Sequence, residues 1–436
     1  MPDWSYQPLL KPLLFRLPPS QARAITLGAT GMLARLPFGK ELVRFIGGMC
    51  PPLAVARSIS SCGLTLPSPV GLASGFPLDK NSLGSLLQFG FGFIELGPVG
   101  LKTSGSEPND IAGFNPEKEE ITYHSGAALY SLAEVKALLL EYKDAGAVFA
   151  VRLLPEPEID LAQAAAELSG LCQFIVVDAT TGPAPSLDKL PVASSGLDTT
   201  QLLLAVSADC RFADEYFIQC QSHGVHGIII ADAKLEGGGA KSLRAGRSLL
   251  SEGLALAQRL KALLPNTLLV GAAGIIEPKD ALSYLETCQL VAVHSGFVFS
   301  GPGLAKRIND AITYDTVGRG IVPSRLLWTG WGGLAALGVG LIICSTSSFA
   351  VGMSSIILPY DEEFMGITKS TLNSCNTHIL QFMSHDRVTY SGTGLSTGIL
   401  YFLLALFGTK RQDSWLYKSI AVSAGVGFST FLLFLG

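Results

Sequence analysis

Residues 174–179 read FIVVDA, a run of aromatic and β-branched residues followed by an acidic one, Asp178, and an alanine. Seven further runs of this kind occur along residues 61–315, each rich in Val, Ile or Leu and with little alternation of polar and apolar positions. They are PVGLAS (69–74), GFIEL (92–96), VFAVRLL (148–154), LLLAVS (202–207), GIIIAD (227–232), TLLVGAA (267–273) and LVAVHS (290–295). Such runs are typical of parallel strands that are buried on both faces.

Amphipathic segments separate these runs, as in SLAEVKALLLEYKDAG (131–146), EPEIDLAQAAAELSGL (156–171) and GRSLLSEGLALAQRLKALLP (246–265). Eight strand–helix units over residues 61–315 predict an α/β domain with the (β/α)8, or TIM, barrel fold. An open doubly wound sheet is the alternative. It normally has fewer strands, and no GxGxxG fingerprint follows any of the runs.

Charge is scarce and unevenly distributed along the 436 residues. Asp, Glu, Lys and Arg make up 15% of the chain, against about 25% in soluble domains, and only eleven of them lie in residues 322–436. The net charge of −4 and the lack of a basic run argue against a nucleic-acid partner. The composition also excludes intrinsic disorder. We therefore expect a globular body and a membrane-embedded C-terminal region.

Three apolar segments in residues 322–436 predict an α-helical transmembrane region, with spans at about 326–349, 388–408 and 419–436. Lys and Arg are enriched before the first span and between the second and third. By the positive-inside rule this predicts a multi-pass protein of the cell (inner) membrane with the barrel on the cytoplasmic side. The chain ends on an apolar run, which favours a natural chain that continues past Gly436.

The external loop, 361–387, contains His378 and His385. Two histidines at that spacing are weak evidence for a metal site, and a solvated loop is the simpler interpretation. The eight cysteines show no CxxC pair, which is typical of reduced, mostly buried thiols. The segment EGGGAKS (236–242) has Ala240 where a P-loop needs glycine, so we do not interpret it as a nucleotide loop.

Residues 1–60 lie outside the barrel pattern. They predict two short amphipathic helices joined at Pro18–Pro19, with apolar faces and basic residues such as Lys11 and Arg16. Such helices suit the plane of a bilayer surface. Packing against the barrel is the alternative.

Chemistry in a (β/α)8 barrel takes place at the carboxyl ends of the strands. Those ends carry the candidate site residues Ser74, Lys80, Arg152, Asp178, Thr180, Thr181, Ser207, Asp232, Lys234, Gly271 to Gly274 and His294 to Gly296. The loops after the seventh and eighth runs read GAAGI (271–275) and HSGFVFSGPGL (294–304). Small residues there let backbone N–H groups approach an anion such as a phosphate.

In the order of its segments, the chain resembles the membrane-associated, quinone-linked dihydroorotate dehydrogenases. The segments that carry the resemblance are the apolar N-terminal helices, SPVGLASGF…DKN (68–81), LLQFGFGFIELGPV (86–99), FIVVDATTGPAPSL (174–187), GIIIADAKL (227–235), VGAAGI (270–275) and HSGFVFSGPGL (294–304). The resemblance covers about residues 6–312. It implies a barrel that holds FMN, dihydroorotate as the small-molecule substrate, and electron transfer to a membrane quinone between the N-terminal helices, as part of pyrimidine biosynthesis. Residues 322–436 have no counterpart in the usual family member.

Carried over position by position, the resemblance implies catalytic roles for three residues. Lys80 matches the lysine that contacts the substrate carboxylate, Thr181 stands where the family has its serine base, and Asp178 replaces an asparagine beside it. It implies a cofactor site formed by Ala73, Ser74, Gly97, Asp232, Lys234, Gly271, Ala273, Gly274, His294, Ser295 and Gly296. No metal is implied.

The chain departs from the family in the polar groups that hold substrate and flavin. The amide-rich substrate segment is replaced by ITYHSGA (121–127), a strand-three asparagine by Arg152, and the flavin-contacting lysine of strand five by Ala205. Lys234 is the candidate replacement for that lysine. A site that loses such hydrogen-bonding groups normally loses orders of magnitude in activity.

Three hypotheses follow from these departures. The first is an FMN-dependent oxidoreductase of the dihydroorotate dehydrogenase family. The second is a non-catalytic barrel that serves as a binding or scaffold module on a membrane domain. The third is a flavoenzyme for another, cationic or hydroxylated, substrate, since Asp178 and Asp232 replace neutral amides. Membrane lipid is an expected partner, and the sequence carries no signal for an oligomeric state.

Overall fold

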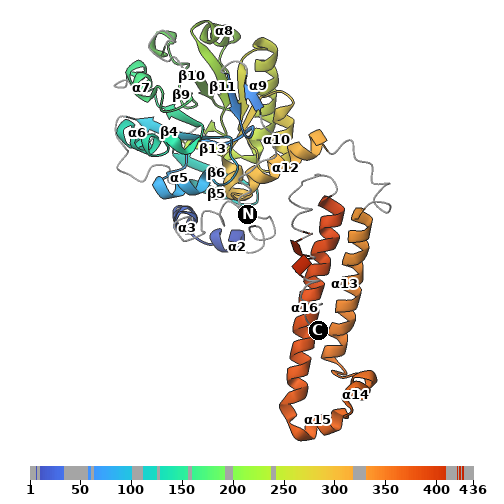
Figure 1. Cartoon of the computed structure of the whole chain (residues 1–436). Helices are drawn as coiled ribbons and strands as arrows, with labels where there is room; N and C mark the ends of the chain where they lie inside the picture. Colours follow the sequence, from blue (N-terminus) through green and yellow to red (C-terminus); the bar gives the residue numbers. More distant parts are fainter. Residues whose placement is uncertain are drawn as a thin grey trace. The chain divides into compact units, whose positions relative to one another are not determined.

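The computed structural model describes residues 6, 10–33, 57–59, 63–100, 111–124, 128–155, 160–191, 200–236, 242–317, 330–408, 420, 422–423 and 425–426. The chain forms two compact units, Met1–Thr313 and Tyr314–Gly436, each of which is described by itself. Figure 1 shows the barrel of the first unit and the long helices of the second.

The first unit is a closed barrel of eight parallel strands. The strands are β3 (Val70–Leu72), β4 (Phe93–Gly100), β8 (Phe149–Leu153), β9 (Phe174–Ala179), β10 (Gln201–Val206), β11 (Val225–Ile230), β14 (Leu268–Gly271) and β15 (Leu290–Val293). The last strand, β15, pairs in parallel with the first, β3, with Val291 opposite Val70. This pairing confirms the predicted barrel and excludes the open sheet. A short strand, β7 (Tyr130–Ser131), adds to the end of β4.

Each barrel strand is buried on both faces, as its apolar run predicts. Along β9, Phe174 and Val176 belong to the cluster inside the barrel. The alternate residues Ile175 and Val177 belong to the larger cluster between the strands and the surrounding helices. Because successive side chains of a strand point to opposite faces, this alternation fixes which polar residues point into the barrel.

Helices surround the strands, and three of them begin at residues whose side chains cap the helix. They are α5 (Lys80–Leu86), α6 (Leu132–Glu141), α7 (Leu161–Leu168), α8 (Asp214–Ser222), α9 (Leu250–Leu263), α10 (Pro278–Leu285), α11 (Ser295–Phe299) and α12 (Leu304–Val317). Asp79, Ser131 and Asp160 cap α5, α6 and α7 by accepting hydrogen bonds from first-turn N–H groups. The segments predicted at 131–146, 156–171 and 246–265 contain α6, α7 and α9.

Two antiparallel additions were not predicted from the sequence. One is the pair β1 (Arg57–Ile59) and β2 (Leu64–Leu66). The other is a four-stranded sheet in the order β12 (Lys234–Glu236), β13 (Ser242–Gly246), β6 (Glu120–His124) and β5 (Ile111–Asn115). Its strands come from the loops after β4 and β11, so it lies at the carboxyl end of the barrel strands, which we call the barrel mouth.

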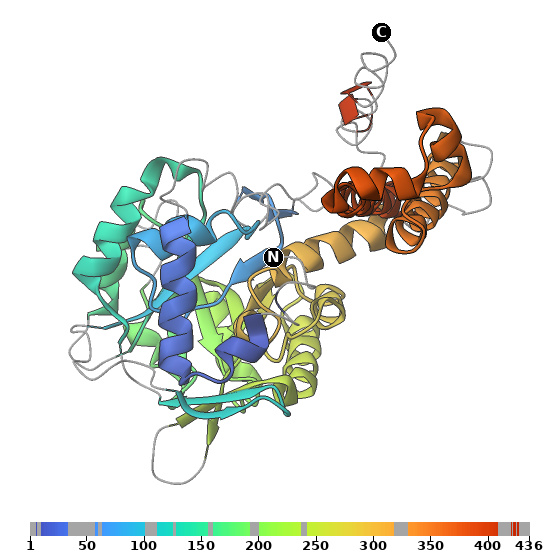
Figure 2. The same ribbon diagram turned by 90° about the horizontal axis from the view of Figure 1, so that it is seen from below.

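The N-terminal helices α2 (Lys11–Leu14) and α3 (Pro19–Leu33) confirm the predicted pair with a break at Pro18. They lie across the mouth side of the barrel (Figure 2), and Gly31 of α3 lies close to Asn81 of α5. Leu13, Ile25 and Met32 remain exposed. The two helices therefore pack against the barrel, as one interpretation of the sequence had it, and present some apolar side chains outward. Contact with a bilayer surface stays a prediction.

The second unit contains α13 (Gly330–Met353), α14 (Pro359–Met365), α15 (Lys369–Cys375) and α16 (Thr377–Gly408). In α13, the 22-residue segment Gly332–Met353 is long and apolar enough to cross a membrane by length and composition, and it is the one described helix that meets this test. It overlaps the first predicted span, 326–349, over residues 332–349. The second predicted span falls within α16, and most of the third lies outside the described residues.

Glycines let α13 and α16 approach closely. A Cβ on Gly398 would lie 2.9 Å from the carbonyl oxygen of Gly338 and 2.9 Å from the nitrogen of Ile342. A Cβ on Gly338 would lie 2.6 Å from the nitrogen of Phe402. Close backbone contact at small residues is the usual way in which apolar helices associate in lipid.

We expect Gly398→Leu to destabilise this helical hairpin by about 2 kcal/mol, because the new side chain meets backbone atoms that cannot move aside. Thermal unfolding of the detergent-solubilised chain measures the effect. Gly392→Leu on the same helix is the control, since a Cβ there meets nothing within 4 Å. Equal losses in the two variants would contradict the packing described.

Candidate functional site at the barrel mouth

Three charged side chains point into the barrel from adjacent strands. Phe93, Ala150 and Phe174 lie in the interior cluster. By the two-residue period of a strand, Glu95 of β4, Arg152 of β8 and Asp178 of β9 point inward as well. Their exposed fractions are only 2%, 6% and 7%. The barrel mouth therefore contains a buried ionic cluster that the strands themselves position.

Arg152 is the centre of this cluster. Its Nε donates to Glu95 Oε1 at 2.6 Å, and its Nη1 lies 3.7 Å from Asp178 Oδ2. The other Glu95 oxygen accepts from the backbone N–H of Ser74 at 3.1 Å. Burial would lower the pKa of Arg152, but the charges of Glu95 and Asp178 outweigh burial and raise it. The guanidinium is therefore a permanent cation between two carboxylates.

Asp178 and Thr181 line the same polar cavity at the mouth, together with Ser74, Thr180 and Asp232. Asp178 Oδ1 accepts from the N–H and the hydroxyl of Thr180, at 2.8 Å and 2.6 Å. No hydrogen bond joins Asp178 to Thr181, although both are described. The structure brings the two predicted catalytic residues to one cavity, and a base role for Thr181 stays a prediction.

Asp232 follows β11 and lies beneath the loops after β14 and β15. Its Oδ1 accepts from the N–H groups of Gly246 at 3.1 Å and Gly274 at 2.9 Å. Its Oδ2 accepts from the N–H of Ser295 at 3.1 Å and lies 3.5 Å from His294 Nδ1. Only 4% of the residue is exposed. One carboxylate thus holds three backbone N–H groups from three separate segments.

Burial would raise the pKa of the Asp232 carboxyl. Hydrogen bonds from His294, Ser295 and Gly274, with the charge of His294, outweigh burial and hold this pKa below its ordinary value. The group is therefore ionised at neutral pH, and its charge is compensated by donors rather than by water.

This lowered pKa predicts a pH-dependent contribution to stability. Ionised Asp232 stabilises the folded chain above its unfolded pKa of about 3.9, and the contribution is lost as the pH falls through the lower folded value. We expect Asp232→Asn to unfold more easily at pH 7 by roughly 3 kcal/mol, with a difference from wild type that shrinks below about pH 4. Chemical denaturation from pH 7 to pH 3 measures this, and a pH-independent difference would contradict it.

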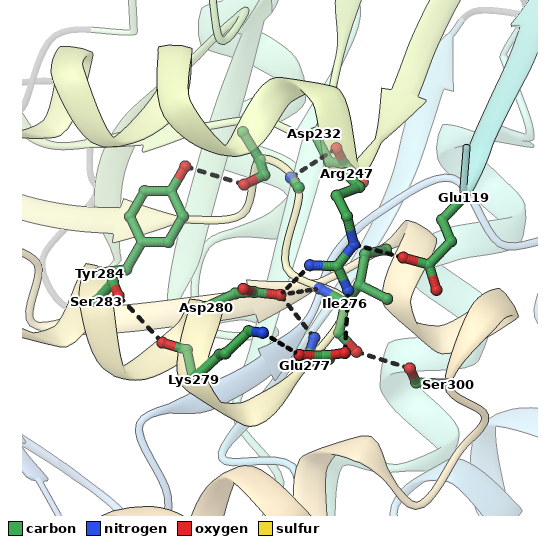
Figure 3. A network of polar contacts seen from close by, with 12 residues as sticks. Glu119, Asp232, Arg247, Ile276, Glu277, Lys279, Asp280, Ser283, Tyr284 and Ser300 are labelled. Carbon is green, nitrogen blue, oxygen red and sulfur yellow. Dashed lines mark hydrogen bonds and ion pairs between the residues drawn. The ribbon is translucent and has the colours of Figure 1, made fainter. Parts of the chain in front are cut away.

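The loops that surround Asp232 are held by a second network, drawn in Figure 3. Arg247 pairs with Glu119 in the turn between β5 and β6, and with Glu277 and Asp280 at the start of α10. Asp280 in turn accepts from the N–H groups of Ile276 and Glu277 at 3.0 Å and 2.7 Å. The antiparallel sheet and the loop after β14 are thereby fixed to each other.

Two predicted lysines do not join the site. Lys80 is the first residue of α5, where its exposed ammonium pairs with Glu141. Lys234 Nζ donates to Glu252 at 2.7 Å and lies 4.0 Å from Asp209. Neither lysine lines the polar cavity. The reason is local, because each side chain has a carboxylate partner on a neighbouring surface element.

At the small residues predicted for the cofactor site, the backbone packs closely against neighbouring parts of the barrel. A Cβ on Gly271 would lie 2.2 Å from the Tyr284 ring, and one on Gly296 would lie 2.1 Å from the Ile275 carbonyl oxygen. Gly97 has a φ of +138° and lies against the backbone of Arg152. Ala73 lines the polar cavity, and the Ala273 carbonyl accepts from the Tyr284 hydroxyl at 3.0 Å.

An apolar cavity of about 120 Å³ lies between the N-terminal helices and the mouth. Its walls include Leu14 and Phe15 near α2, Ala22 and Leu27 of α3, and Phe76 and Phe297 of the barrel. Tyr123 and His294 line both this cavity and the polar one, with ring centroids 5.7 Å apart. The two cavities therefore meet at this pair of rings.

Sequence reasoning missed Glu95 and Tyr123. A glutamate inside the apolar run GFIEL is a recognisable signal, because a buried carboxylate needs a partner and Arg152 lies at the matching end of the next barrel strand. Tyr123 gives no such signal. It reaches the mouth through the antiparallel sheet, where it pairs with Leu243 of β13.

The fold and the site define a (β/α)8-barrel protein with a polar mouth covered by an apolar N-terminal helix pair. The chain is a diverged relative of the quinone-linked dihydroorotate dehydrogenases. It is 26% identical over 343 residues to dihydroorotate dehydrogenase (quinone) of Chloroflexus aurantiacus, covering 70% of this chain and 94% of the relative. It is 25% identical over 352 residues to the enzyme of that name from Acinetobacter baumannii, covering 70% and 99%.

The solved structures agree on the fold. The dihydroorotate dehydrogenase of Eimeria tenella in complex with ferulenol superposes with a TM-score of 0.53 at 16% identity, covering 66% of this chain and 93% of that chain. No family model matches the chain. In sequence and in fold, then, the chain is similar to the dihydroorotate dehydrogenases.

That homology implies FMN, whose phosphate needs free donors after the last strands of the barrel. Here the N–H groups of Gly274 and Ser295 already donate to the Asp232 carboxylate. A phosphate at these groups would lie in contact with a buried negative charge. The residues present therefore do not fit the phosphate of FMN.

Proposed function

We propose that the barrel and its N-terminal helices bind a quinone-class ligand, with an aromatic head group and an isoprenoid tail, at a membrane surface. The apolar cavity between α2, α3 and the mouth carries this proposal. Apolar walls with a few polar groups at one end are what such a ligand requires. The relatives are named for a quinone, which supports the same class of ligand.

Tyr123 and His294 supply the polar end of the cavity. Burial raises the pKa of Tyr123, and the negative charge of Asp232 raises it further. The hydroxyl therefore stays protonated and can donate a hydrogen bond. A quinone carbonyl is an acceptor of the kind this hydroxyl can satisfy. The tail of the ligand would lie among Phe15, Leu27 and Phe297.

Membrane attachment forms part of the proposal. The exposed Leu13, Ile25 and Met32 on the N-terminal helices suit insertion into the bilayer surface. Helix α13 suits a span. We propose a multi-pass protein of the inner membrane with the barrel on the cytoplasmic side, which agrees with the distribution of Lys and Arg in the sequence.

The relatives are named for the oxidation of dihydroorotate, a carboxylate. In this chain Glu95, Asp178 and Asp232 place three carboxylates at the mouth, against the guanidinium of Arg152 and the imidazole of His294. This surplus of negative charge disfavours an anionic substrate. We therefore propose a quinone-binding barrel whose role does not require dihydroorotate oxidation.

A titration of the purified full chain in detergent with decylubiquinone tests the proposal. We expect saturable binding that decanol, which lacks the head group, does not compete away. Absent binding, or equal competition by decanol, would overturn it. A second assay follows orotate formation from dihydroorotate and decylubiquinone by absorbance. Orotate formation would show that this chain has the relatives' activity and would contradict the proposed role.

A further inference from the structure

Three backbone N–H groups converge on one point in the barrel mouth. They belong to Gly246 at the end of β13, Gly274 after β14 and Ser295 after β15. Gly246 and Gly274 have φ values of +136° and +70°, which side-chain-bearing residues rarely adopt. The backbone is thus held in a conformation that aims donors inward.

Such a convergence after the last strands of a (β/α)8 barrel is the usual form of an anion site. The anion here is part of the chain, because both oxygens of Asp232 accept from these groups at 2.9 to 3.1 Å. With 4% exposure, the carboxylate is largely shielded from solvent, so its charge is only weakly screened from a second anion. A phosphate group and Asp232 cannot share these donors.

We propose that Asp232 is a resident anion that closes the barrel's phosphate cradle, so that the chain does not bind phosphorylated cofactors such as FMN and gains that capacity when the carboxylate is removed. The proposal concerns the polar mouth and is independent of the apolar cavity. The buried Ser295 hydroxyl lies beside the cradle, on the residue whose backbone N–H donates to Asp232.

The test uses the purified full chain in detergent, titrated with FMN, riboflavin and inorganic phosphate. Flavin fluorescence anisotropy follows the first two, and protection against thermal unfolding follows phosphate. We expect no FMN binding by wild type. We expect Asp232→Ser to bind FMN more tightly than riboflavin by roughly tenfold or more, since only FMN carries a phosphate to which the freed N–H groups can donate hydrogen bonds.

Asp209→Ser is the matched control. It removes a carboxylate from the loop after β10, at the same end of the barrel, and leaves the cradle closed, so it should bind neither flavin. If the wild-type chain binds FMN but not riboflavin, its cradle accepts a phosphate. That result overturns the proposal, whatever the variants do. So does a folded Asp232→Ser chain that gains no affinity for FMN or phosphate. If Asp232→Ser does not fold, the near-isosteric Asp232→Asn variant takes its place.

Discussion

An Arg152→Met variant should lose about 3–5 kcal/mol of unfolding free energy, the cost of breaking a buried ionic cluster by removing one partner. Arg152 is the only cation near Glu95 and Asp178 among the described residues that line the mouth. Without it, two carboxylates remain buried inside the barrel with their mutual repulsion uncompensated. Urea denaturation of the full chain, followed by near-ultraviolet circular dichroism, measures the loss.

Lys136→Met provides the matched control. Lys136 Nζ lies 3.3 Å from Glu167 on the outer surface, and both side chains are about 40% exposed. Exposed ion pairs of this kind contribute about 0–1 kcal/mol. A similar small loss for Arg152→Met would mean that the interior cluster is hydrated and does not stabilise the barrel.

Filling the apolar cavity should weaken quinone binding. Ala22 of α3 lines that cavity, and an indole in its place would occupy the volume that the ligand needs. We expect Ala22→Trp to weaken decylubiquinone binding by roughly tenfold or more, because overlap of this size costs about 1–3 kcal/mol. The measurement is the same detergent titration as for wild type.

Ala24→Trp is the control on the same helix. Ala24 is exposed and does not line the cavity, so quinone affinity should stay at the wild-type level. Equal loss in both variants would show that the bulky residue acts on the whole helix. Unchanged affinity in Ala22→Trp would place the quinone elsewhere.

The barrel could be predicted from the sequence because each strand carries its own signal. A strand buried on both faces must be apolar along its length, and the eight runs show this locally. The same local rule singles out Arg152 and Asp178 as charged residues within apolar runs, and it would also have revealed Glu95, which the sequence reasoning missed. The helix pair at Pro18 was equally readable, since proline and amphipathic spacing act over a few residues.

The roles of the lysines could not be predicted in this way. Lys80 and Lys234 were assigned to the mouth by their sequence neighbours, but their long side chains pair with Glu141 and Glu252 on the outer helices. A flexible side chain goes to the nearest compensating charge, and the sequence does not reveal which charge that is.

By itself, then, the sequence determined the barrel, its apolar termini and the chemical types of the residues at the mouth. Only the tertiary structure decided what Asp232 does. Its partners Gly246, Gly274 and Ser295 are 14, 42 and 63 residues away, and they meet the carboxylate only because closure of the barrel brings three loops together. Backbone donors leave no mark in a sequence, since every residue except proline has one. The difference between an open anion site and a closed one therefore appears only in the folded chain.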